Sequence, residues 1–372
     1  MKTAYLLGSL NRGGTETLLL DVFRNAKSQG LDAIGVYRKG GVLENDFKKA
    51  GLPIFKLTPR FPFDPFYLLK LRRLLKKENI GIVHAQQYLD VLYAWVATCR
   101  TNVKIIQTLH GFDDLDENKK NKLLAFVTKR TDKNIYVSDF QKRFYTRKYE
   151  LDERKQTTVY NGISFTKFDE QNEIVDLPRA KSSSISLQIG MVGNFVRGRE
   201  QNTVCRFLNL LKESNSVEFD FYFIGAKNNA EPWRYDDCVR YCEDNDLSDC
   251  VHFLGSRNDV PAILKQLDAF IYSTDHDTFG IAVIEAIACG IPVFVNDWEV
   301  MTEITEGGKY AYVYETKNER DLFNKFQLFL KRKDEYRLKA ESDKLDIRRK
   351  YSIEKHILQL LEVYSKTIHS SC

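Results

Sequence analysis

The chain has 372 residues, of which 43% are hydrophobic and 29% charged, with a formal net charge of +5. This length and composition indicate a soluble, folded protein with two domains. No secretory leader pattern and no uninterrupted apolar span is recognised in the sequence, so we do not expect an exported or membrane-spanning protein. Seven cysteines, odd in number and scattered, fit a reducing compartment, so we expect a cytoplasmic protein.

Short apolar runs alternate with helical patterns along the whole chain, which predicts parallel sheets with helices on both faces. We expect two doubly wound α/β domains, residues 1–168 and 169–351, joined by a polar stretch at residues 169–184. A final amphipathic helix is expected at residues 352–372. The expected strands are residues 3–8, 33–37, 54–57, 81–84, 103–109, 133–137 and 157–160, then 185–190, 219–224, 251–254, 269–272, 292–295 and 310–313.

The two halves of the chain carry opposite charge. Residues 1–165 hold 29 Lys and Arg against 17 Asp and Glu, a net +12, and the remainder holds 27 against 34, a net −7. The positive charge gathers in two predicted helices, residues 68–77 and 119–130, and each run alone is typical of a solvated helix surface. Aromatic residues at 60–67 directly precede the first run, a pattern typical of contact with an anionic membrane surface. No nucleic-acid-binding pattern accompanies the charge.

A glycine pair follows the first strand of the first half, and two arginines follow the first strand of the second half. Gly13 and Gly14 lie between the first strand and a helix, where the backbone could approach a ligand closely, although a simple tight turn is the alternative. The Gly-x-Gly-x-x-Gly pattern is absent there, which argues against an NAD enzyme. Arg197 and Arg199 follow the first strand of the second half, and guanidinium groups suit phosphate oxygens.

The segment from residue 273 to 295 orders a strand end, an acidic loop, a glycine, a helix and a further strand. The N–H groups near Phe279, Gly280 and Ile281 should face a bound anion, helped by the helix dipole. Glu285 lies about one turn further on, in an otherwise apolar helix, and Asp277 precedes that helix. Two acids across an anion-binding turn predict a ligand with both phosphate and hydroxyl groups.

Asp277 and Glu285, with Phe279 and Gly280 between them, resemble the paired-acid motif of retaining glycosyltransferases of family 4, and the residues from Glu285 to Val295 are similar to that family's helix and next strand. The resemblance implies the GT-B fold, two Rossmann-like domains facing a central cleft, with the final helix packing back on the first domain. The family usually has Glu where this chain has Asp277.

The resemblance also implies roles for individual residues. Gly13 and Gly14 would border the donor phosphates and the acceptor, and Arg257 to Val260 would line the nucleotide base through their backbone. Alignment on the strand ending at Val192 puts Asn194 at the family's usual Arg, where a neutral hydrogen bond would replace the charge. Arg197 and Arg199, with the amides near Gly280, would hold the diphosphate. The catalytic set would be His110 and Asp277 on the sugar and Glu285 on the ribose.

The expected activity is transfer of a sugar from a nucleoside-diphosphate donor, most simply a UDP-sugar, to a hydroxyl of a glycan or lipid-linked glycan. Neither a metal nor a further cofactor is expected, because arginine and amide donors would neutralise the leaving group. One alternative is a non-catalytic sugar-nucleotide-binding subunit with the same fold, and another is a nucleotide-sugar epimerase. A position at the inner face of the membrane follows from the basic first half.

Overall fold

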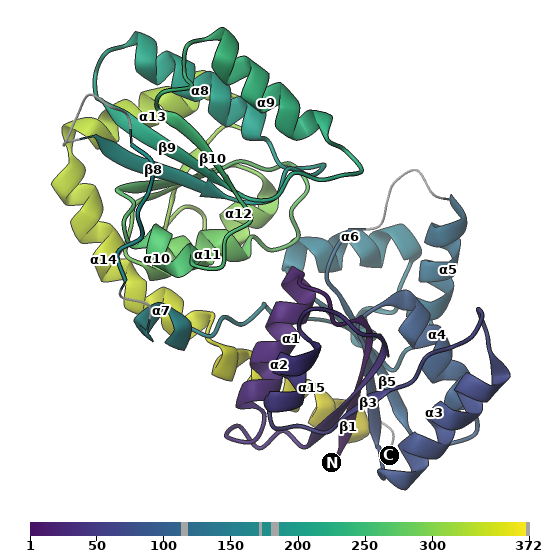
Figure 1. Ribbon diagram of the computed structural model, residues 1–372. Coiled ribbons are helices and arrows are strands. Elements are labelled where there is room, and N and C mark those ends of the chain that lie inside the picture. Colours follow the sequence, from purple (N-terminus) through teal and green to yellow (C-terminus); the bar gives the residue numbers. More distant parts are fainter. Residues whose placement is uncertain (113–117, 171–172, 180–185, 370–372) are drawn as a thin grey trace. The chain divides into compact units, whose positions relative to one another are not determined.

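The structure is a computed structural model that describes residues 1–112, 118–170, 173–179 and 186–369 (Figure 1). It divides into two compact units, Met1–Ser164 with Tyr351–Cys372, and Phe165–Lys350. The first boundary therefore lies slightly before the expected residue 168. Parts of the expected linker, residues 171–172 and 180–184, and the expected strand start at Ile185 lie outside the described residues, as do residues 370–372 of the expected final helix.

The first unit contains a parallel sheet in the order β3-β2-β1-β4-β5-β6-β7. The chain builds outward from β1 in one direction and then restarts on its other side at β4, since Thr3 pairs with both Ala33 and Ile82. The strands are β1 Thr3–Ser9, β2 Ala33–Lys39, β3 Ile54–Lys56, β4 Ile82–Ala85, β5 Lys104–Leu109, β6 Lys133–Tyr136 and β7 Gln156–Thr158.

Helices cover both faces of this sheet because successive side chains of a strand point to opposite sides. Tyr5 and Leu7 of β1 pack into one core with Ile353 and Ile357 of the last helix, whereas Ala4 and Leu6 pack into the other. The Tyr5 hydroxyl also lies 2.7 Å from that of Tyr364. The helices are α1 Gly14–Asn25, α2 Glu44–Lys49, α3 Pro65–Lys77, α4 Tyr88–Ala97, α5 Asn118–Thr128, α6 Asp139–Tyr149 and α15 Ile353–His369, with a 3₁₀ turn at Glu153–Lys155.

The second unit repeats the same topology, with the strand order β10-β9-β8-β11-β12-β13. Its strands are β8 Leu187–Val192, β9 Phe219–Ile224, β10 Val251–Gly255, β11 Ala269–Tyr272, β12 Val293–Asn296 and β13 Tyr312–Tyr314. Its helices are α7 Thr166–Glu170, α8 Gln201–Glu213, α9 Trp233–Asp244, α10 Val260–Leu264, α11 Ile281–Ala288, α12 Glu299–Ile304, α13 Glu319–Lys331 and α14 Lys333–Lys350. Here the strand order reverses between β8 and β11.

The two doubly wound parallel sheets expected from the sequence are confirmed, and every expected strand is present with its bounds within two residues of the prediction. Apolar runs fix these positions because strands of parallel sheets are buried on both faces. All four residues of β11 are buried, for example. Within the described ranges, no helix combines the length and the apolar character needed to cross a bilayer.

Candidate functional site

The strand-order reversal between β8 and β11 brings two loops together at the carboxyl ends of the strands. Ligands of open α/β sheets bind in the crevice at such a point. The loop after β8 and the loop after β11 form an isolated antiparallel bridge between Arg199 and Thr274. The Glu200 N–H donates to the Ser273 carbonyl at 3.0 Å, and the Thr274 hydroxyl donates to the Gly198 carbonyl at 2.6 Å. Two segments far apart in the sequence thus form one surface.

Glycine occupies two positions of the first loop. Gly198 has a φ of +84°, and a β-carbon at this position would collide with the β-carbon of His276. Gly193 faces Arg199, whose Nε would lie 3.3 Å from an added β-carbon. Gly198 is therefore needed for this close approach, whereas a β-carbon at position 193 would only crowd the Arg199 side chain.

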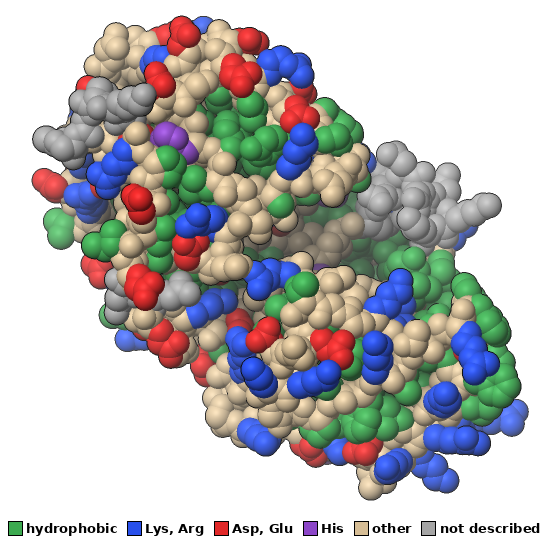
Figure 2. Space-filling model, in the orientation of Figure 1, with side chains coloured by type: hydrophobic (Ala, Val, Ile, Leu, Met, Phe, Trp, Pro, Cys, Tyr) green, Lys and Arg blue, Asp and Glu red, His purple; other side chains and the backbone are tan. Residues whose placement is uncertain are grey.

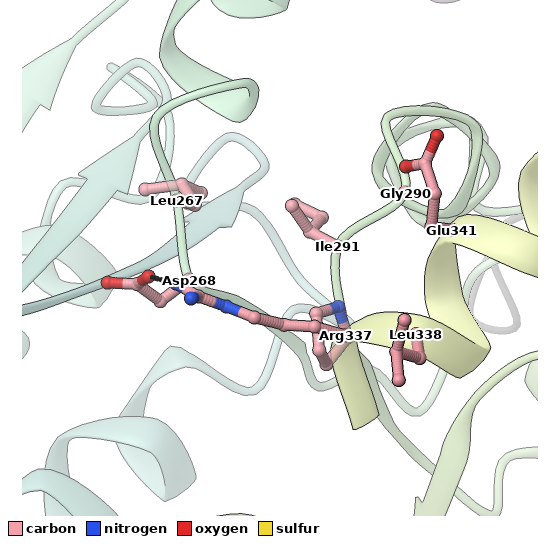
Figure 3. A pocket seen from close by; sticks show the side chains of 8 residues that line it. Leu267, Asp268, Gly290, Ile291, Arg337, Leu338 and Glu341 are labelled. Carbon is pink, nitrogen blue, oxygen red and sulfur yellow. Dashed lines mark hydrogen bonds and ion pairs between the residues drawn. The ribbon is translucent and has the colours of Figure 1, made fainter. Parts of the chain in front are cut away.

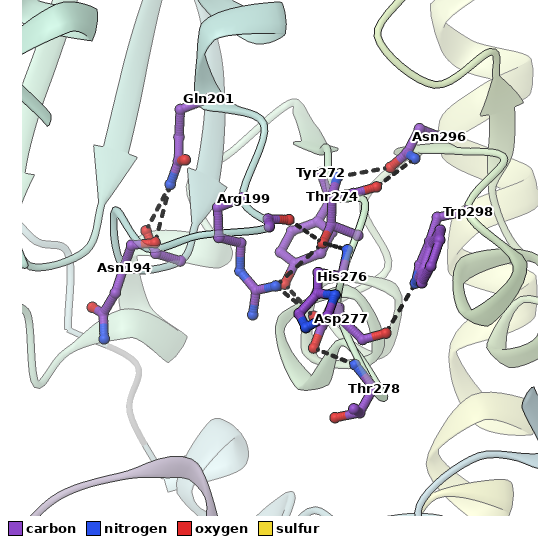
Figure 4. A network of polar contacts seen from close by, with 12 residues as sticks. Asn194, Arg199, Gln201, Tyr272, Thr274, His276, Asp277, Thr278, Asn296 and Trp298 are labelled. Carbon is purple, nitrogen blue, oxygen red and sulfur yellow. Dashed lines mark hydrogen bonds and ion pairs between the residues drawn. The ribbon is translucent and has the colours of Figure 1, made fainter. Parts of the chain in front are cut away.

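Asn296, at the end of β12, holds the loop after β11 in place with its side chain. It is fully buried, its Oδ1 accepts a hydrogen bond from the Thr274 N–H at 2.9 Å, and its Nδ2 donates to the Thr274 carbonyl at 2.7 Å (Figure 4). The same Nδ2 lies 2.7 Å from the Thr316 hydroxyl oxygen. Further along the loop, the Trp298 indole N–H donates to the Asp277 carbonyl at 2.9 Å. Side chains of the next strand and helix therefore determine where Asp277 lies.

The Asp277 carboxylate is the centre of a compact polar cluster (Figure 4). Its Oδ2 lies 3.1 Å from Arg199 Nη1 and accepts a hydrogen bond from the Tyr272 hydroxyl at 2.6 Å. Its Oδ1 accepts from the Thr278 N–H at 2.9 Å. The side chains of Arg199 and Asp277 are only 21% and 12% exposed, so this ion pair is partly shielded from water.

Burial and charge act on the ionisation of this cluster in different directions. Burial lowers the pKa of Arg199, but the Asp277 carboxylate and the Tyr272 hydroxyl together raise it by more. The pKa of Arg199 therefore lies above its ordinary value. Burial raises the pKa of Tyr272 well above its usual range, so the phenol stays protonated and donates. The Arg199 guanidinium also lies 5.3 Å from the centroid of the Tyr272 ring. The cluster is thus a cation, a carboxylate and a neutral phenol.

Helix α11 begins beside this cluster. Its N-cap, Gly280, adopts the left-handed conformation with φ 80° and ψ 56°, and an added β-carbon would lie 2.7 Å from Cε of Met301, so a larger residue there would be strained. The first two N–H groups of α11, those of Ile281 and Ala282, have no acceptor within the helix, whereas the Val283 N–H donates to the Gly280 carbonyl at 3.0 Å. Ile281, Ala282 and Glu285 form its less buried side, while the rest of α11 is buried. Glu285 therefore lies on the same helix face as Ile281 and Ala282, one turn from the start of α11.

The remaining predicted residues of this unit lie around the cluster without joining it. Asn194 is exposed, and its Oδ1 accepts a hydrogen bond from the Ala226 N–H at 2.8 Å, which leaves its amide nitrogen available to a ligand. The backbone N–H of Arg197 donates to Glu231 Oε2 at 3.0 Å. Arg257 follows β10, two strands from β8.

Arg257 forms two hydrogen bonds to Asp259, from Nε to Oδ1 at 2.8 Å and from Nη2 to Oδ2 at 2.5 Å. The guanidinium is thereby engaged next to Val260, the first residue of α10. The backbone of this turn is the part that the sequence interpretation assigned to a ligand.

In the first unit, the predicted residues lie at the carboxyl ends of β1 and β5. Gly13 is the N-cap of α1, Gly14 is its first residue, and Glu16 Oε2 would lie 2.6 Å from a β-carbon added to Gly13. His110 follows β5, and its Nε2 lies 2.7 Å from Gln86 Oε1. Burial, and secondarily the nearby His356, lowers the pKa of His110 to about 3, so this imidazole is neutral at pH 7.

The sequence interpretation missed Tyr272, Thr274, Asn296 and Trp298. Tyr272 and Asn296 each end an apolar strand, at the sheet edge where parallel strands bind ligands. A residue with a polar group at that position was the available signal. Tyr272 instead counted only as part of an apolar run.

A separate hollow of about 290 Å³ lies at the opposite, amino-terminal edge of the same strands (Figure 3). It is lined by Leu267 and Asp268, which precede β11, and by Gly290 to Pro292, which precede β12. Arg337 of α14 points at Asp268 and pairs with it. None of the predicted site residues lines this hollow, so it does not belong to the cluster around Asp277.

Comparison with known proteins gives matches over most of the chain. Residues 12–167 match the family described as Glycosyltransferase Family 4, and residues 148–344 match Glycosyl transferases group 1. An Escherichia coli protein named UDP-Gal:alpha-D-GlcNAc-diphosphoundecaprenol alpha-1,3-galactosyltransferase is 25% identical over 62% of this chain and 61% of its own length. The chain thus aligns with about three fifths of that relative. N-acetyl-alpha-D-glucosaminyl L-malate synthase of Bacillus anthracis is 22% identical over 82% of this chain and 79% of its own length.

Solved structures give the same architecture. A glycosyltransferase from Rickettsia africae superposes with a TM-score of 0.84 at 20% identity, covering 99% of this chain and 98% of that one. Anabaena HepE in complex with UDP superposes with a TM-score of 0.83 at 15% identity, covering 98% and 100%. These likenesses establish the GT-B fold, and the group 1 match covers more than half of the chain. The chain belongs to the family Glycosyl transferases group 1.

Proposed function

We propose that the protein transfers a sugar from a nucleoside-diphosphate sugar to a hydroxyl of a glycan or lipid-linked glycan, with retention of anomeric configuration. One observation carries the proposal: Arg199, Asp277 and the start of α11 converge at the strand-order reversal of the second unit. A cation and free amides there suit a diphosphate. Supporting a uridine donor, the Escherichia coli relative is named for UDP-Gal and the Anabaena structure contains UDP.

In this proposal Arg199 and the first amides of α11 hold the diphosphate, Glu285 accepts hydrogen bonds from the ribose, and Asp277 accepts them from the sugar. The backbone from Arg257 to Val260 lines the base, because the Arg257 side chain is engaged by Asp259. Asn194 offers its amide nitrogen to the phosphates, and Arg197 lies in the same loop.

Catalysis would come from orientation and charge stabilisation. In a same-face substitution, the bond from the anomeric carbon to the diphosphate oxygen breaks while the acceptor oxygen bonds to that carbon, and the leaving phosphate takes the acceptor proton. No protein base is needed. Because Arg199 and the amides neutralise the leaving group, the proposal needs no metal ion. His110 acts as a neutral hydrogen-bonding group on the sugar, since its pKa of about 3 leaves it uncharged. Gly13 and Gly14 let the backbone approach the acceptor and donor phosphates.

The test is a transfer assay with a panel of nucleotide sugars and lipid-extract acceptors. Glu285→Ala should abolish transfer while leaving the fold intact, and Glu341→Ala, which removes an exposed glutamate of the same unit, should not change it. Near-normal turnover of Glu285→Ala would reject the ribose role. Binding without turnover across the whole panel would favour the non-catalytic subunit, and an epimerised sugar nucleotide without acceptor would favour an epimerase.

We also propose that the first unit docks on an anionic bilayer, at the inner face of the membrane. Phe61, Phe63 and Phe66 at the start of α3 are 55%, 54% and 63% exposed. Trp95 of α4 and Phe126 of α5 are 42% and 39% exposed. Figure 2 shows apolar side chains beside Lys and Arg on the face carrying these helices. Exposed aromatic rings beside cations suit an anionic lipid surface, and the lipid-linked acceptor class would be found there.

Vesicle flotation at low salt tests the membrane proposal. Replacing the exposed Arg73, Lys76 and Lys77 by Ala should weaken binding to vesicles with anionic lipid. Arg72 is left intact because its Nη1 donates to the Ala97 and Cys99 carbonyls at 3.0 and 2.8 Å and so fastens α3 to the end of α4. A control variant replaces three cations of the second unit: Lys331, Lys333 and Arg349. Equal flotation of both variants would remove the proposal.

A further inference from the structure

The Arg199 guanidinium has hydrogen-bonding capacity that the protein does not use. Among the described residues its ion pair is with Asp277 alone, and the same Nη1 lies 3.3 Å from the Thr274 hydroxyl oxygen. Its Nε is buried without a hydrogen-bond partner in the described part of the chain. A buried, unpaired donor is costly unless a ligand meets it, so the group is prepared for a partner with more acceptors than one carboxylate.

Asp277, by contrast, keeps good partners if Arg199 turns away. The Tyr272 hydroxyl and the Thr278 N–H would still donate to its two oxygens, at 2.6 and 2.9 Å. Tyr272 is itself buried, and its raised pKa keeps the phenol a donor. The carboxylate can therefore stay in place when the ion pair opens.

A diphosphate and Asp277 compete for the same cation. Phosphate oxygens carry more charge than a carboxylate and accept two parallel bonds from a guanidinium, so the diphosphate is the stronger partner. Once it is bound, however, the Asp277 carboxylate lies close to a second anion and repels it. Sugar hydroxyls donating to Asp277 would offset that repulsion, and a nucleoside diphosphate without a sugar provides none.

We propose that Asp277 is an internal counter-ion of Arg199 that the donor displaces. Tyr272 then holds the displaced carboxylate against the sugar. After transfer the ion pair between Asp277 and Arg199 re-forms and favours release of the nucleoside diphosphate. Tyr272 is thus a positioning residue. The inference rests on the proposed function, because it assumes a diphosphate donor at this sheet edge. It predicts that the site discriminates between a donor and its own leaving group by means of Asp277.

Calorimetric titration with UDP, UDP-glucose and UDP-galactose tests this without a transfer reaction. Asp277→Asn should bind UDP about five- to tenfold more tightly than the unaltered protein, the size of effect expected of a partly shielded charge pair. The ratio of its affinity for a UDP-sugar to its affinity for UDP should fall towards one. The control is Asp275→Asn, which removes a carboxylate two residues earlier that pairs with Lys317. Its UDP affinity should change by less than about twofold, as expected for a screened surface charge.

The role of Tyr272 is tested by Tyr272→Phe, alone and combined with Asp277→Asn. Loss of the hydroxyl should weaken UDP binding about threefold when Asp277 is present, because the displaced carboxylate loses a donor. In the Asp277→Asn background the same substitution should have no effect. A purely structural role of the phenol would weaken binding equally in both backgrounds, and that result would overturn the assignment.

The outcomes separate the inference from the proposed function. If UDP, GDP and ADP all fail to raise the melting temperature of the unaltered protein, both the proposed donor site and the counter-ion role of Asp277 are rejected. If UDP binds but Asp277→Asn binds it equally or more weakly, only the counter-ion is overturned. If Asp277→Asn without ligand melts at a much lower temperature than the unaltered protein, the single variant Tyr272→Phe is the test of the counter-ion proposal. A UDP affinity of Tyr272→Phe equal to that of the unaltered protein would then reject the proposal.

Discussion

Replacing Asn296 with Ala should loosen the loop that carries Asp277. The asparagine side chain makes three hydrogen bonds, two to the backbone of Thr274 and one to the Thr316 hydroxyl. Asn296 and Thr274 are both fully buried. Alanine would therefore leave the Thr274 N–H and carbonyl without their partner in a place that bulk water does not reach. Each such group costs about 1–3 kcal/mol, so we expect the free energy of unfolding to fall by about 2–4 kcal/mol once some relaxation is allowed.

Urea denaturation followed by tryptophan fluorescence measures this change, because Trp298 contacts the loop that carries Asp277 by donating to the Asp277 carbonyl. The matched control is Asn245→Ala in the same unit, which removes one hydrogen bond, from Nδ2 to the Tyr241 carbonyl at 2.8 Å, at a half-buried position. That variant should lose only about 0.5–1.5 kcal/mol. UDP should also raise the melting temperature of Asn296→Ala less, since Asp277 and its neighbours lose their support. A loss in Asn296→Ala no larger than in the control would refute the reasoning that this buried amide holds the loop.

Two further outcomes are expected. Gly280→Ala should destabilise the second unit by about 1–3 kcal/mol, because φ is +80° and Cε of Met301 would lie 2.7 Å from the new β-carbon, whereas Gly111→Ala has open space and should be nearly neutral in thermal unfolding. Burial lowers the pKa of His84 to about 3 and of His356 to about 4, so the unfolded chain, with a pKa near 6.5, binds their protons first as the pH falls. The free energy of unfolding of the first unit should therefore be highest above about pH 6.5 and decline towards pH 4, by up to about 1.4 kcal/mol per pH unit for each histidine. Urea midpoints measured at pH 7, 6 and 5 should fall less steeply in His356→Gln than in the unaltered protein.

The strands and the order of helices were predictable because each rests on a local pattern. The apolar run of β11, the left-handed Gly280 and the terminating Gly290, with φ 76°, all appear in one short stretch of sequence. The contact between Arg257 and Asp259 is also local, since the residues lie two positions apart. Such features need no knowledge of the rest of the fold.

The partners of Asp277 could not be predicted in the same way. Arg199 reaches it only because β8 and β11 are neighbours in the sheet, and that adjacency is a property of the topology. The support from Asn296 depends in turn on β12 pairing with β11. Sequence distance hides both contacts, so the motif predicted candidate binding residues and left open which side chains of the protein they contact.

The shorter acid at position 277 is better understood through its neighbours than through its length. The family usually has Glu at the corresponding position, and Asp lacks one methylene, which taken alone withdraws the carboxylate by about 1.5 Å. In this chain the Tyr272 hydroxyl meets the shorter side chain at 2.6 Å, and Arg199 meets it at 3.1 Å. A glutamate would carry its carboxylate beyond this phenol, so Asp277 and Tyr272 make sense as a pair. The Tyr272 hydroxyl and the Thr278 N–H keep the direction of Asp277 fixed when Arg199 turns to a diphosphate, as the proposed recognition of a sugar hydroxyl requires, and the substitution is therefore no evidence of a lost site.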